Sequence, residues 1–164
     1  MSKLALKTEG DTHVIVTRHF AATPEAVYRA HTDPKIVQQW MLGPEGWIMP
    51  VCISDARPGG KIRYEWRNGK GQGFYLTGEY VELHPYSKIV HIERMHLPDP
   101  TPDNHIETHF EAEGTGTRMT MRMTLPDAKT RAAMLATGME HGMETSYVRL
   151  EGMIGDLIPS AASR

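Results

Sequence analysis

The sequence has little of several features that would fix a compartment or a chemistry. Its single cysteine, Cys52, excludes an internal disulfide. Cys52 lies in a strand-like stretch and is interpreted as a small core residue, because a reactive thiol needs surroundings that stabilise its thiolate. The first residues lack the apolar region of a signal peptide, and no apolar run approaches the ~18 residues of a membrane span. We therefore expect a soluble, cytoplasmic protein.

An excess of charge of one sign is also missing. The chain has 18 Lys and Arg against 20 Asp and Glu, and its basic residues form no long run. Neither nucleic acid nor a membrane is therefore expected as a partner. The glycine-rich stretch 69–73 lacks the Lys-Ser/Thr pair and the following helix of a phosphate-binding loop. No catalytic motif and no cofactor is predicted, which favours a non-enzymatic function.

Phenylalanine is scarce, with three residues, whereas methionine is frequent, with 11. Methionine is flexible and polarizable, so it fills irregular cores and adapts to varied apolar ligands. The length of 164 residues fits one domain over residues 1–164, with a core at about 12–158.

Local patterns predict a first strand, then two short helices, and then six further strands. Thr23-Pro24 and Asp33-Pro34 are helix-start signals, and they predict helices over about 24–31 and 35–41. Strict alternation, as in Ile62, Tyr64 and Trp66 against charged neighbours, predicts strands. Residues 1–11 are expected to be frayed or part of an edge strand. The expected strands cover residues 13–20, 47–57, 61–68, 73–83, 88–97, 105–113 and 117–125.

The last third of the chain predicts a long helix. Glycine is unfavourable inside a helix, so we expect a short helix over 127–137, a break near Gly138, and a long helix to about Ile158. The order β-α-α-β-β-β-β-β-β-α predicts an α+β fold in which about seven antiparallel strands curve around that helix, leaving a hollow. Apolar residues recur there at helical spacing: Leu135, Met139, Met143, Tyr147, Leu150, Ile154 and Leu157.

Four local patterns together resemble the helix-grip fold of the START-like SRPBCC superfamily. They are residues 20–30 with Asp33-Pro34 and Trp40, residues 57–64, residues 78–90 with the Pro85 turn, and residues 138–150. Because they occur in the right order across about 12–157, the chain is similar to the heat-shock-protein ATPase activator homologue family within that superfamily.

The resemblance implies a cavity between the sheet and the long helix. Superfamily members bind lipids, hormones, polyketides and other apolar molecules there, and a minority catalyse reactions. Eukaryotic relatives bind a chaperone and stimulate its ATPase, a stress-response function. The family shares no catalytic motif, so no catalytic residue carries over. The implied partner is a small apolar molecule or a chaperone or other protein, and the chain is a monomer or a homodimer.

The candidate ligand-binding residues are those predicted to face the interior. For each apolar member, ordinary core packing is the alternative. Met139, Met143 and Tyr147, near the middle of the long helix, are the strongest candidates. The full set is Trp40, Trp47, Met49, Tyr64, Trp66, Tyr80, His91, Glu93, Met119, Met121, Met123, Met139, Met143 and Tyr147.

The histidines do not predict a metal site. His105 and His109 are four residues apart in a strand, about 13 Å, which is too far for one zinc ion. They are expected in solvent, because Ile106, Thr108 and Phe110 should form the inner face. His91 and Glu93 share a face with Ile89 and Met95, so they could form the acid/base pair of a cyclase- or hydrolase-like enzyme acting in the hollow, or a polar anchor for a ligand there. Equally, Val90 and Ile92 could face inward and leave the pair in water.

A second surface could serve a partner protein. Basic residues gather on the predicted outer faces of two strands, although such a face is usually only solvated. These residues are Lys61, Arg63, Arg67, Arg118 and Arg122.

Overall fold

The computed structural model describes residues 3–157, whose strands form one eight-stranded antiparallel sheet in the order β1-β2-β8-β7-β6-β5-β4-β3. The α+β helix-grip fold is thus confirmed. The sheet has one strand more than the expected seven, because the N-terminal segment pairs with β2 as an edge strand. The strands are β1 (Ala5–Glu9), β2 (His13–Phe20), β3 (Trp47–Ser54), β4 (Lys61–Asn68), β5 (Gly73–His84), β6 (Lys88–His96), β7 (Asn104–Glu113) and β8 (Gly116–Thr124).

The first two helices begin directly after the predicted capping residues Thr23 and Asp33, and the third begins after Asp127. They are α1 (Pro24–Thr32), α2 (Pro34–Trp40), α3 (Ala128–Leu135) and α4 (Met139–Leu157). The side chain of Thr23 accepts the Ala26 N–H at 3.2 Å, and Asp127 accepts the Thr130 N–H at 2.7 Å. Gly138 has a φ of 79°, which separates α3 from α4 as expected. The predicted helix end at Ile158 lies outside the described residues.

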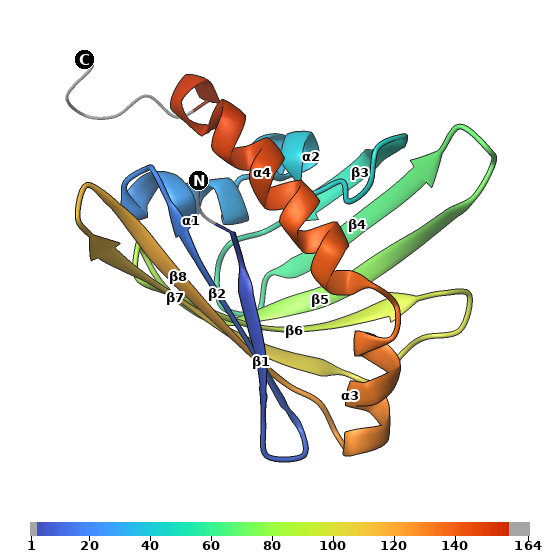
Figure 1. Cartoon of the computed structure of the whole chain (residues 1–164). Helices are drawn as coiled ribbons and strands as arrows, with labels where there is room; N and C mark the ends of the chain where they lie inside the picture. Colours follow the sequence, from blue (N-terminus) through green and yellow to red (C-terminus); the bar gives the residue numbers. More distant parts are fainter. Residues whose placement is uncertain (1–2, 158–164) are drawn as a thin grey trace.

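The sheet is curved, and α4 crosses its concave face (Figure 1). The pairing register shifts between Ile48 and Val51 in β3 and between Tyr80 and Glu82 in β5, and such bulges bend a strand. In Figure 1, α1 and α2 lie near one end of α4 and α3 near the other. β3 ends at Ser54, short of the predicted residue 57, because the Asp55 N–H bonds to the Lys61 carbonyl at 3.0 Å and closes the turn.

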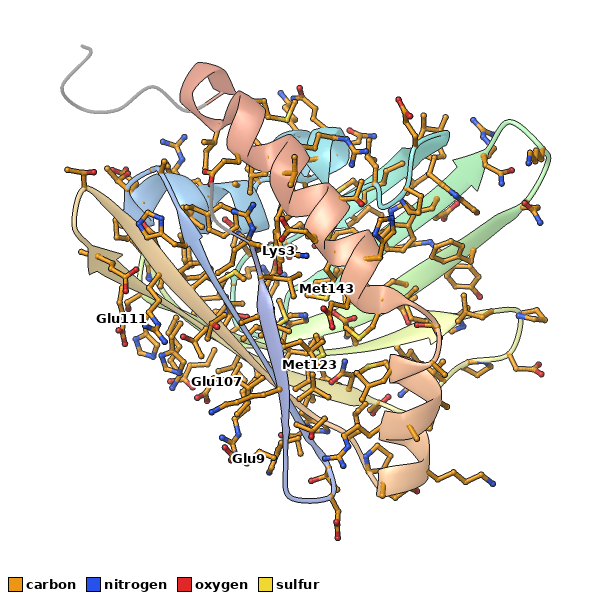
Figure 2. The ribbon with its side chains drawn as sticks, in the orientation of Figure 1. Lys3, Glu9, Glu107, Glu111, Met123 and Met143 are labelled. Atoms are coloured by element: carbon orange, nitrogen blue, oxygen red, sulfur yellow. The ribbon has the colours of Figure 1, made fainter. Side chains whose placement is uncertain are left out.

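Alternation along the strands places the apolar residues on the concave face. Ile62 and Tyr64 of β4 and Met119 and Met123 of β8 are buried there. β7 turns Ile106, Thr108 and Phe110 inward, as predicted, and all three are buried. Figure 2 shows Met123 and Met143 on the side of the sheet that α4 covers, whereas Glu107 and Glu111 extend from the opposite side.

A buried arginine, which the strand patterns did not single out, joins α4 to β2. The Arg18 side chain is 0% exposed, and its guanidinium lies 3.1 Å from Glu144 and 3.2 Å from Glu151. These two glutamates also accept the backbone N–H groups of Leu4 and Ala21. The only sequence signal for this contact is that Arg18 alternates in phase with the inward Val16 and Phe20.

Candidate ligand-binding site

Half of the predicted ligand-binding residues are buried in the packed core. Trp40 is 1% exposed, donates its indole N–H to the Ala30 carbonyl at 2.9 Å, and stacks on Tyr147 at 5.8 Å. These residues hold α2 and α4 on the sheet. The buried half consists of Trp40, Met49, Tyr64, Tyr80, Met119, Met123 and Tyr147.

The other half face the same side but stay partly exposed. Trp66 donates its indole N–H to the Met41 carbonyl at 2.8 Å and stacks on Phe74 at 5.0 Å, which fixes its ring. The partly exposed half consists of Trp47, Trp66, His91, Glu93, Met121, Met139 and Met143. Met95 of β6 and Met134 of α3 belong with them, since both are partly exposed and pack against the core.

The structure decides the orientation of β6. His91 pairs with Tyr80 of β5 and with Ile106 of β7, both of which face inward. His91 and Glu93 therefore lie on the concave face, with side chains 17% and 21% exposed. Nε2 of His91 lies 2.8 Å from Oε1 of Glu93. This geometry satisfies what both the acid/base hypothesis and the polar-anchor hypothesis require.

Hydroxyl groups lie on the same side of the sheet, and the Tyr80 ring lies 6.3 Å from that of His91. Ser54 donates to the Thr32 carbonyl at 2.7 Å and shares a 2.7 Å hydrogen bond with the Tyr80 hydroxyl. Burial raises the pKa of Tyr64 and Tyr80 above the ordinary value, so both phenols stay protonated and can act as donors. Burial likewise raises the pKa of Cys52 to about 11, which agrees with a packing function for its thiol.

His31, at the end of α1, belongs to the same region and was not predicted. Its Nδ1 lies 2.7 Å from the Val27 carbonyl, and its ring contacts Trp40 and Phe110 edge-on or tilted. Burial, opposed by the Val27 hydrogen bond and helped by nearby His91, lowers the pKa of His31 from 6.5 to about 4. His31 is therefore neutral near physiological pH. Its position, four residues after Val27 on the buried side of α1, is the only sequence signal.

Among the described residues, the surface is hollowed at two places away from the middle of α4. One, of about 390 Å³, lies at the end of the β4–β5 hairpin and is lined by Trp66, Phe74, Tyr75 and His96. The other, of about 260 Å³, lies beside β1 and β2. Of the predicted residues, Trp66 lines the first hollow. Neither hollow includes Met139, Met143 or Tyr147, so ligand binding by these three stays a prediction.

Comparison with known proteins identifies the family. Residues 21–155, most of the chain, match the family described as Activator of Hsp90 ATPase homolog 1-like protein. The chain belongs to this family. No curated protein matches.

Solved structures show the same fold over almost the whole of this activator-homolog chain. A protein from Rhodobacter sphaeroides is 28% identical, with a TM-score of 0.85, and the match covers 94% of this chain and 99% of that one. A protein from Mycobacterium smegmatis is 21% identical, with a TM-score of 0.81 and coverage of 92% and 96%. A protein from Nitrosomonas europaea is 20% identical, with a TM-score of 0.79 and coverage of 91% and 97%. At these two lower identities the likeness shows the fold alone.

The outer face of this activator homolog carries paired charges. Lys61 bonds to Glu79 at 2.8 Å, and Arg63 bonds to Glu65 at 2.6 Å. Arg118 and Arg122 likewise pair with glutamates, at 3.6 Å and 3.0 Å. In the sheet, β4 and β8 are separated by β5, β6 and β7, so the two basic groups are not contiguous. The predicted basic face is therefore divided and largely neutralised.

The two histidines of β7, His105 and His109, lie on this outer face, as predicted. His105 is exposed, and His109 is partly exposed and lies 2.8 Å from Glu107. Across residues 3–157, no three side chains of the metal-binding types gather closely enough to hold an ion. Among those residues, no helix is both long and apolar enough to span a membrane.

Proposed function

We propose that this activator homolog binds a small apolar molecule, such as a lipid, between the first half of α4 and the centre of the sheet. The observation that carries the proposal is the partial exposure of apolar side chains on the core side of the sheet. Met121, Met139 and Met143 all pack against the buried core, yet each keeps part of its surface accessible. A filled core would bury them, since apolar surface left in water costs about 25 cal/mol per Å².

The composition of this surface suits apolar ligands of different shapes. Methionine has three rotatable bonds, so the side chains of α4 and β8 can move to fit different apolar molecules. In the second half of α4, by contrast, Leu150 and Ile154 are buried against the core. The proposal therefore places the ligand near Met139 and Met143.

Substituting Met143 tests the proposal. Nile red, a neutral dye that fluoresces in apolar surroundings, should bind the native protein and reach saturation. Met143→Trp should abolish that signal, because the larger ring fills the space beneath α4. Val148→Trp is the matched control, since Val148 is 44% exposed on the same helix, and it should leave dye uptake unchanged. Equal uptake by a Met143→Trp protein with native circular dichroism and melting temperature would refute the proposed site.

A second candidate comes from the family description, which names activation of the Hsp90 ATPase. It ranks second because the outer-face charges are already paired within the chain. Adding the purified chain to purified Hsp90 and measuring ATP hydrolysis tests it. An unchanged rate at a large excess of the chain would remove this candidate.

A further inference from the structure

The concave face contains three buried polar atoms that have no hydrogen-bond partner among the described residues. They are Nε2 of His31, Nδ1 of His91 and Oδ1 of Asn104. Buried polar atoms are nearly always paired, because leaving one unpaired costs the free energy of desolvating it. Three on one face indicate that a bound group completes their hydrogen bonds.

His31 presents an acceptor. Its Nδ1 faces the Val27 carbonyl at 2.7 Å, and a carbonyl oxygen can only accept a hydrogen bond. The proton of this neutral ring therefore lies on Nδ1. Nε2 carries a lone pair, so the group that completes it must be a donor.

His91 presents an acceptor for the same kind of reason. Its Nε2 faces the carboxylate of Glu93 at 2.8 Å, and an ionised carboxylate can only accept. In the neutral ring, Nε2 therefore carries the proton, and the buried Nδ1 carries the lone pair. Glu93 thus fixes the tautomer, as carboxylates commonly do for functional histidines.

The two strand neighbours of Glu93 are Asn104, which adds a polar side chain, and Gly78, which leaves space beside the carboxylate. Both are paired with Glu93, Asn104 on β7 and Gly78 on β5. The amide nitrogen of Asn104 lies 3.9 Å from the sulfur of Met134, which leaves Oδ1 as a third acceptor. Gly78 has no side chain to cover Glu93, so the carboxylate remains 21% exposed.

We infer that the molecule bound on this face carries at least one hydroxyl donor on an apolar frame, as a phenol or a hydrophobic alcohol does, and that His91, with His31 for a second hydroxyl, accepts the hydrogen bond. This inference rests on the proposed function and names the chemical class of its ligand. A carboxylate ligand such as a fatty acid fits poorly, because it brings more acceptors and a second negative charge close to Glu93. Arg18, whose charge would attract an anion, is bonded to Glu144 and Glu151.

Three probes of similar size test the inference by displacing Nile red: para-nonylphenol, para-nonylanisole and para-nonylbenzoate. They share an apolar frame and differ only in the polar end. The phenol should bind about tenfold more tightly than the anisole, since only the phenol can donate to the buried acceptors. The benzoate should bind less tightly than the phenol.

Variants of His91 test whether this residue causes the preference for the phenol over the anisole. His91→Phe should bring the affinities for the phenol and the anisole to near equality while leaving the anisole affinity unchanged. His91→Asn, which keeps an acceptor near the position of Nδ1, should retain part of the preference. His109→Phe is the matched control, because His109 makes the same 2.8 Å contact with a glutamate two residues away, but on the outer face. It should retain the full preference.

The outcomes separate the two proposals. Equal binding of the phenol and the anisole by the native protein, or tightest binding of the benzoate, overturns the donor inference and leaves the apolar site standing. A phenol preference that survives His91→Phe overturns the assignment to His91. If Nile red and all three probes fail to bind, the proposed function itself is wrong, and this inference fails with it.

Discussion

Replacing Arg18 with methionine should destabilise the protein more than any change to its surface ion pairs. Arg18 is the buried contact between β2 and α4, with a side chain 0% exposed and two glutamate partners at 3.1 Å and 3.2 Å. Methionine preserves much of the apolar stem of the side chain. Arg18→Met therefore removes the charge and its hydrogen bonds while keeping most of the packing volume.

The expected loss follows from the burial of the partners. Removing one member of a buried ion pair typically costs about 3–5 kcal/mol, because the charge left behind is uncompensated. The side chains of Glu144 and Glu151 remain 17% and 18% exposed, so water relieves part of that cost. We expect a loss of about 3 kcal/mol in the free energy of unfolding near neutral pH. For a chain of this length that corresponds to a melting temperature lower by about 6–12 °C.

Urea unfolding followed by tryptophan fluorescence measures this loss, with Arg63→Met as the control. Arg63 lies 2.6 Å from Glu65, a shorter contact than either contact of Arg18, but its side chain is 40% exposed. Its substitution should cost less than about 1 kcal/mol, because water screens surface ion pairs. If Arg18→Met costs no more than Arg63→Met, the reasoning from burial is refuted.

The pH dependence provides a second check on the same contact. Burial acts to raise the pKa of Glu144, but the hydrogen bonds from Arg18 and from the Leu4 N–H outweigh it and hold that pKa below the ordinary 4.5. A lowered carboxyl pKa stabilises the fold above the ordinary value, and the stabilisation is lost as the pH falls through the folded-state pKa. The difference between native and Arg18→Met proteins should therefore shrink below about pH 4.5. A difference that stays constant into acid would contradict the proposed pairing.

Two further predictions concern the concave face. Because burial lowers the pKa of His31 to about 4, its contribution to stability should be complete above the ordinary 6.5 and disappear as the pH falls between these values. Urea midpoints over that range should depend less on pH in His31→Phe than in the native protein, whereas His105→Phe, on the exposed outer face, should change nothing. Gly78→Ala should destabilise by about 1–3 kcal/mol in the same assay, because its Cβ would lie 2.5 Å from the Ile92 carbonyl oxygen. Gly142→Ala is its counterpart inside α4, with no atom within 4 Å of the added Cβ, and should instead stabilise the helix. A neutral Gly78→Ala would show that β5 and β6 can separate locally without cost.

Local chemistry made much of the fold predictable. The caps at Thr23, Asp33 and Asp127 bond within three residues, so the starts of their helices follow from short stretches of sequence. The break at Gly138 likewise depends on the backbone of one residue. The fold itself was predicted from the order of these local patterns, and the family match confirms it. By contrast, β1 is a short, weakly patterned five-residue stretch, and it becomes a strand because β2 offers it an unpaired edge.

The site was less predictable, because its contacts join residues far apart in the chain. In β6 the two faces are almost equally apolar, Ile89 and Met95 against Val90 and Ile92, so alternation alone left the direction of His91 and Glu93 open. Only pairing with Tyr80 and Ile106 turns them inward.

By itself, the sequence determined the elements, their order and the long amphipathic helix, because these depend on contacts within a few residues. Tertiary structure alone decided which polar groups lie beneath that helix. It placed Arg18 against α4, turned His91 and Asn104 to the inner face of the sheet, and packed His31 of α1 against Phe110 on that side. The physical reason is that burial and hydrogen-bond partnership are properties of a three-dimensional neighbourhood, and here that neighbourhood is built from α1, α4 and the strands β2, β6 and β7, elements spread along most of the chain.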